Sequence, residues 1–124
     1  MSKASARDQA LSALYAADVT ASAPDVTGIS ARAARYVTGT WEDREIIDAA
    51  ISAAAIGWRI ERMPAVDRNV IRLALHELRC GDTPVGVVVS EAVNLAKRFS
   101  TERSGAFVNG VLAKILAASE ESSV

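Results

Sequence analysis

The sequence contains little of what most catalytic and metal sites are built from. It has one cysteine, Cys80, which excludes a disulfide within the chain and favours a reducing compartment. It has one histidine, His76, so the two residues together fall short of the four nitrogen and sulfur ligands of an ordinary zinc site. The seven glycines are scattered, and none forms the GxxxxGK or GxGxxG loops that hold phosphates. We therefore expect no metal and no cofactor.

His76 and Cys80 stand four residues apart and could touch on a helix. They are either a nucleophile with its base or an exposed histidine beside an inert thiol. The first reading needs an orienting group and a cleft, so the second is favoured and no enzyme is expected.

Long apolar runs are also absent, and this bears on location. No stretch of about 18 apolar residues occurs, so we expect no membrane span. The N-terminus lacks the apolar core of a signal peptide. These absences predict a cytoplasmic protein.

What the sequence does contain is helix-forming. Half of its residues are apolar, many are alanine, and the apolar positions recur at helical spacing. We predict an all-α fold in one compact domain of six or seven helices over residues 1–118, followed by a frayed polar tail at 119–124. Helices are expected over about 4–18, 30–38 (ending at Gly39), 40–56 (capped by Thr40), 64–80, 85–99 and 104–117.

Charge is distributed unevenly along the chain. Net charge is −1, yet residues 59–118 hold nine basic and six acidic groups. Arg68, Arg72 and Arg79 fall on one side of a helix, and Lys97, Arg98 and Arg103 form a second basic cluster. Such residues make either a solvated helix face or a phosphate-binding surface. Phe107, one helical turn beyond Arg103, is either a core residue or a platform on which a base stacks.

Three ordered blocks carry a resemblance to a known family. They are "GWRIERMPAVDRNVIRLALHEL" from residue 57, "DTPVGVVVSEAVNLAKRFST" from residue 82 and "SGAFVNGVLAKI" from residue 104; "ALSALYAADV" near the N-terminus adds to them. Together they resemble the NusB family of transcription antitermination factors. The resemblance implies an all-α fold of two packed helical sub-bundles.

The resemblance also implies a function. Such a protein is an RNA-binding adaptor that recognises a single-stranded boxA element. It acts together with the small-subunit ribosomal protein NusE. The complex joins RNA polymerase in an antitermination complex, notably during rRNA synthesis.

The resemblance implies roles for particular residues. Asp67 is expected near the rim of its helix, where it would meet the ribosomal protein. Asn109 and Gly110 are unfavourable inside a helix. We expect Gly110 to permit a close backbone or helix approach and Asn109 to cap or fasten a neighbouring segment, so that Phe107 stays at the surface. The implied RNA-binding residues are Lys3, Arg7, Tyr15, Arg72, Phe107 and Asn109, and the implied partner-binding residues are Glu61, Asp67 and Arg103.

The chain departs from the family pattern in ways that predict few phosphate contacts. Its N-terminal arm has only Lys3 and Arg7, and Arg103 and Ala106 stand where an acid and a lysine are usual. The alternatives are a diverged NusB-like paralogue and a homodimeric helical interaction module, with weak or no RNA binding. The fold also occurs as the front half of an rRNA cytosine methyltransferase, which the lack of a cofactor-binding α/β segment here disfavours.

Overall fold

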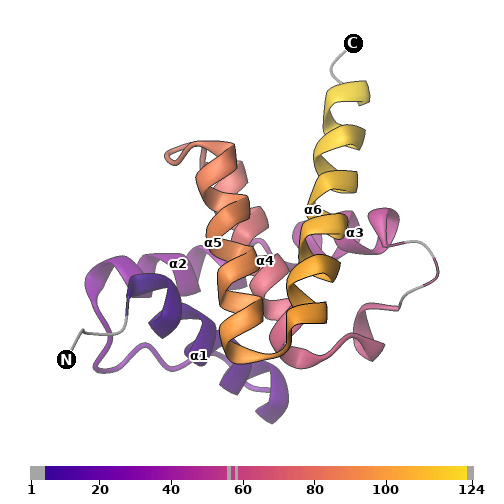
Figure 1. Cartoon of the computed structure of the whole chain (residues 1–124). Coiled ribbons are helices and arrows are strands. Elements are labelled where there is room, and N and C mark those ends of the chain that lie inside the picture. Colours follow the sequence, from indigo (N-terminus) through magenta and orange to yellow (C-terminus); the bar gives the residue numbers. More distant parts are fainter. Residues whose placement is uncertain (1–4, 56, 58, 123–124) are drawn as a thin grey trace.

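The computed structural model describes residues 5–55, 57 and 59–122 of the chain. These residues form six α-helices and one short 3-10 helix, with no strand among them, so the predicted all-α class is confirmed. The elements in chain order are α1 (Ala6–Thr20), α2 (Ala31–Glu42), α3 (Arg44–Ala54), the 3-10 helix η1 (Ile60–Arg62), α4 (Ala65–Cys80), α5 (Val85–Phe99) and α6 (Glu102–Ser122) (Figure 1).

Most helix boundaries follow capping residues that the sequence supplies. Ser5 and Ser30 precede α1 and α2, and each hydroxyl accepts a backbone N–H three residues further on at 3.1 Å. Pro64 and Pro84 stand immediately before α4 and α5. At this position the missing proline N–H costs no hydrogen bond of the helix. Gly81 ends α4 with a φ of 73°, a left-handed conformation that glycine adopts without steric cost.

The predicted end of the second helix at Gly39 is wrong, because α2 continues to Glu42. Thr40, expected to cap the next helix, is buried within α2, and its hydroxyl donates to the carbonyl of Tyr36 at 2.7 Å. Gly39 instead makes room for the His76 imidazole of α4, since a Cβ at this position would lie 2.2 Å from the ring Cε1. The glycine therefore serves the packing of α2 on α4.

Helix α4 is the centre of the molecule. It contacts α1 and α2 on one side and α3, α5 and α6 on the other, which gives two sub-bundles that share one helix. Figure 1 shows this arrangement, with α1 and α2 grouped together and α5 and α6 rising side by side across α4. The largest fully buried apolar side chains come from five of the six helices: Val37, Ile47, Ile51, Val70, Ile71, Leu73, Val88, Leu95, Val108 and Leu112.

Helix α6 is longer than the sequence predicted. It spans Glu102–Ser122 and so includes four of the residues expected in a frayed tail. Alanine and glutamate favour helix, which accounts for the extension. In Figure 1 the last turns of α6 extend past the ends of the other helices. None of the described helices is long and apolar enough to cross a bilayer.

Candidate nucleic-acid interface

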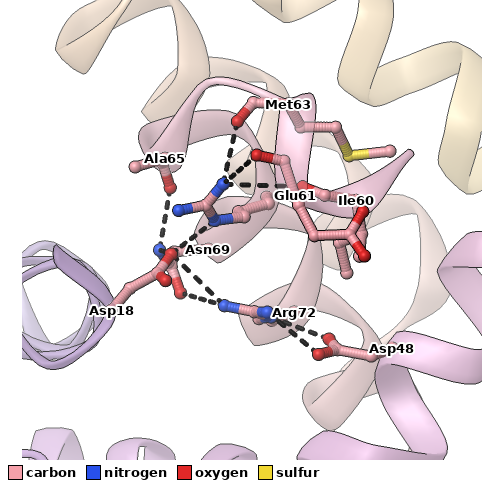
Figure 2. Close-up of polar contacts among 9 residues, drawn as sticks. Asp18, Asp48, Ile60, Glu61, Met63, Ala65, Asn69 and Arg72 are labelled. Atoms are coloured by element: carbon pink, nitrogen blue, oxygen red, sulfur yellow. Dashed lines mark hydrogen bonds and ion pairs between the residues drawn. The ribbon is translucent and has the colours of Figure 1, made fainter. Parts of the chain in front are cut away.

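The arginines on the first half of α4 lie between helices and are neutralised there. Nε and Nη2 of Arg72 donate to the two carboxylate oxygens of Asp48 on α3, at 2.8 and 2.9 Å (Figure 2). Arg68 pairs with Asp18 of α1, and its Nη1 donates to the carbonyl of Met63 at 3.0 Å. The two arginine side chains are 17% and 18% exposed. Neither is a free surface cation.

Asp18 joins these groups into one network. Besides the pair with Arg68, it accepts a hydrogen bond from Nδ2 of Asn69 at 2.8 Å and lies 3.4 Å from Nη1 of Arg72. Burial opposes ionisation of this carboxyl, but the hydrogen bonds from Arg68 and Asn69 outweigh it and lower the pKa of Asp18. A single carboxylate on α1 therefore fixes three polar side chains of α4.

Of the two cations predicted in the N-terminal arm, Arg7 is also paired inside the chain. Its Nη2 lies 2.8 Å from Oε1 of Glu77 on α4, and both side chains are largely buried. The hydrogen bonds that Arg7 donates to Glu77 outweigh burial and raise the pKa of Arg7. Lys3 lies outside the described residues. The arm is thus anchored to α4 through the residue that was predicted to contact RNA.

The two predicted aromatic contacts differ in exposure. Tyr15 on α1 is 41% exposed. Phe107 on α6 is half-buried: it packs against the core and also lines a shallow pocket of about 210 Å³ with Ala54, Gly110 and Lys114. The core reading and the surface reading each describe one part of the Phe107 side chain.

Asn109 and Gly110 lie inside an unbroken helix, and their expected roles need correction. A Cβ on Gly110 would meet no described atom within 4 Å, so no other described segment approaches closely there. Gly110 instead lines the pocket beside Phe107 and leaves it open. Asn109 is exposed on a different groove, between α5 and α6, and fastens no other segment among the described residues. The FVNG motif therefore serves two separate surfaces of α6.

Asp67 does not lie at a helix rim, and that expectation was wrong. The residue is 3% exposed because the turn between α5 and α6 covers it, and its Oδ1 has no hydrogen-bond partner among the described residues. Burial raises the pKa of Asp67, and the hydroxyls of Ser104 and Ser100 offset this only in part. By contrast, Glu61 on η1 and Arg103 on α6 are exposed.

His76 and Cys80 do touch, with 3.5 Å between Nε2 and Sγ. Burial and the nearby Asp82 and Asp43 carboxylates raise the pKa of the Cys80 thiol, whereas a nucleophilic cysteine needs a lowered one. Within the described part of the chain, no three His, Cys, Asp or Glu side chains are grouped so as to hold a metal ion.

The comparison with known proteins decides the family. The model of the NusB family matches residues 4–117, nearly the whole chain. The chain belongs to the NusB family. It is 43% identical over 123 residues to the transcription antitermination protein NusB of Anaeromyxobacter dehalogenans, covering 89% of this chain and 87% of that protein.

Solved NusB structures have the same fold. The solution structure of NusB from Aquifex aeolicus matches with a TM-score of 0.79 and 32% identity, over 96% of this chain and 90% of that one. A crystal structure of antitermination factors NusB and NusE in complex with dsRNA matches with a TM-score of 0.80 and 31% identity, over 91% of this chain and 94% of that one. The resemblance drawn from sequence blocks is confirmed.

The NusB-family match includes every predicted site residue except Lys3. The structure sorts the others: Arg7, Arg72 and Asp67 are held inside the chain, while Tyr15, Glu61, Arg103 and Asn109 are exposed and Phe107 is half-buried. Sequence reasoning missed the acids that hold the arginines, Asp18, Asp48 and Glu77. They lie 50 or more, 24 and 70 residues, respectively, from their arginine partners in sequence, so no local pattern pointed to them.

Proposed function

We propose that this protein is a transcription antitermination factor that binds RNA together with the ribosomal protein NusE. The observation that carries this proposal is the family match over residues 4–117, joined to the fold shared with the NusB–NusE–RNA complex. Antitermination factors of this family are adaptors and not enzymes, which agrees with a Cys80 thiol whose pKa is raised.

The RNA surface that we propose is built from exposed and half-buried groups on α1 and α6. Tyr15 and Phe107 offer rings on which unpaired bases stack, and Asn109, on the separate groove between α5 and α6, offers an amide to the same RNA. Arg7 and Arg72 act indirectly, because their guanidinium groups hold α1, α3 and α4 together. Lys114, exposed beside the Phe107 pocket, supplies a positive charge that the sequence reading did not single out.

For the protein partner we propose contacts at Glu61 and Arg103, both exposed. Asp67 contributes by supporting the α5–α6 turn that precedes Arg103, since its carboxyl lies beside Ser100 and Ser104. The proposal also includes recognition of boxA-type RNA, assembly with RNA polymerase, action in rRNA operons and a cytoplasmic location. They are supported by the resemblance of the sequence blocks to the family.

Fluorescence anisotropy with a labelled boxA-type RNA, with and without NusE, tests the proposal. We expect weak binding by the chain alone and tighter binding with NusE. Phe107→Ala should weaken RNA binding by about 1–3 kcal/mol, the usual value of one stacked base. Because Phe107 is half-buried, the variant should lose less folding stability than the 3–5 kcal/mol typical of a core phenylalanine.

Two results would overturn this proposal. An absence of RNA binding at low salt even with NusE present would favour the diverged paralogue. Light scattering that shows a dimer dissociated by neither RNA nor NusE would favour the homodimeric module.

A further inference from the structure

An open groove of about 800 Å³ lies between α5 and α6, on the side of α6 away from Phe107. Its floor includes Val89 and Val93, which are half-buried. Asn94 stands on the α5 wall and Asn109 on the α6 wall, and both are exposed. The groove is therefore apolar at its base and lined by an amide on each side.

The two amides are available to a ligand. Within the described residues neither Asn94 nor Asn109 makes a side-chain hydrogen bond, and both occupy helical positions that asparagine disfavours. Each amide carries two donors on nitrogen and an acceptor oxygen. Together they can match a partner that presents donors and acceptors on one edge.

A lysine supplies charge at the same groove. Lys97 of α5 lies across Gly105 of α6, where a Cβ would come within 2.7 Å of the lysine Cγ. Its Nζ is 3.8 Å from Glu102, whose side chain is 86% exposed, so this ion pair is weak and solvated. The glycine lets the lysine stem lie in the groove, with the ammonium group at its edge.

We propose that this groove binds unpaired nucleobases of single-stranded RNA, with Asn94 and Asn109 reading base edges and Lys97 contacting phosphate. The inference rests on the proposed RNA binding and adds a second surface that selects bases. Nucleobases have flat faces that suit the valine floor and edges that combine donors and acceptors. A protein anchor would instead be expected to find a deep apolar pocket at the centre of its interface.

The test uses the full chain, with and without NusE, and fluorescein-labelled 12-nucleotide oligo(rU), oligo(rC) and oligo(rA). We expect the wild type to prefer one of these over the weakest by about fivefold or more, as expected when side chains hydrogen-bond to base edges. The double variant Asn94→Ala/Asn109→Ala should reduce that ratio to within about twofold and leave the salt dependence unchanged. Lys97→Ala should do the opposite, lowering the salt slope by about 0.7 and keeping the ratio.

Thr38→Ala, an exposed polar position on α2, is the matched control and should change neither quantity. Circular dichroism melts establish that every variant is folded. The inference is overturned if the wild type shows no preference, or if the double variant keeps it. It is also overturned if that variant weakens NusE binding in the absence of RNA, because the groove is then a protein interface. In these cases Phe107→Ala still weakens RNA binding, whereas failure of the proposed function removes RNA binding altogether.

Discussion

The centre of the molecule and its α5–α6 face use similar side chains in opposite ways. On α4, Arg68, Asn69 and Arg72 are covered by neighbouring helices and hydrogen-bonded to carboxylates from α1 and α3. On α5 and α6, Asn94 and Asn109 are exposed and have no internal partner among the described residues. Both regions contain asparagine. The two regions differ in whether a neighbouring helix supplies a carboxylate as a hydrogen-bond partner.

This difference shows why a count of cations overstates a binding surface. The side chains of Arg7, Arg68 and Arg72 are each less than a fifth exposed, and each is paired with a carboxylate of another helix. Such pairs fix how helices pack. The cations left for a phosphate are those with weak or no internal pairing, such as Lys97 and Lys114.

Removal of the Asp18 carboxylate on α1, which Arg68, Asn69 and Arg72 share, should have the largest effect on the α4 network. Asp18→Ala should lower the free energy of unfolding by about 3 kcal/mol, because it leaves two largely buried guanidinium groups with a lost partner. Chemical denaturation followed by circular dichroism measures this. Glu42→Ala, at an exposed carboxylate on α2, is the control and should leave the midpoint unchanged. A loss below about 1 kcal/mol would mean that the network is not what holds α1 on α4.

Asp67 provides a smaller test with the opposite sign. Its pKa is raised from the ordinary value of 3.8, so the folded chain carries a cost that is absent below that pH and appears as pH rises through the folded-state pKa. Asp67→Asn removes the charge and should raise the free energy of unfolding at neutral pH by roughly 1 kcal/mol. The gain should disappear in acid, below the ordinary pKa.

The wild-type pH profile gives the contrasting case. The pKa of Asp18 is lowered, so its contribution is present above the ordinary value of 3.8 and is lost as pH falls through the folded-state pKa. Denaturation at several pH values separates the two carboxyls. If Asp67→Asn is destabilising at neutral pH, the charged form of Asp67 is needed and the assignment of a costly buried carboxylate fails.

The helices could be predicted from the sequence because their causes are local. Apolar spacing, serine caps and the Gly81 stop each act within a few residues. The errors came where a distant residue decided the outcome. Gly39 was predicted to end a helix, but it makes room for His76. Asp67 was predicted at the rim of its helix, but the α5–α6 turn buries it.

The candidate interface was predictable only in part for the same reason. Tyr15 and Asn109, which the family blocks implied as RNA contacts, are both exposed. Helical periodicity could have separated Phe107 from Asn109, because two residues along a helix turn about 200°. The pairing of Arg72 with Asp48, and the facing of Asn94 and Asn109 across a groove, depend on how helices pack, which a single sequence does not reveal.

The smallest expected effect compares one exposed cation with one buried cation. Lys114 lies beside the Phe107 pocket and has no ion pair within the described residues, so it can release a counterion when a phosphate binds. Lys114→Ala should lower the salt slope of RNA binding by about 0.7, the value for one phosphate on a single strand, and leave folding stability unchanged. Arg72→Ala should do the reverse, because its guanidinium is bound to Asp48 and Asp18: stability falls while the slope stays the same. Anisotropy titrations across a salt series, with denaturation of each variant, measure both quantities. If Arg72→Ala changes the slope as much as Lys114→Ala does, the α4 network opens to bind RNA, and the contrast between a structural centre and a binding face no longer holds.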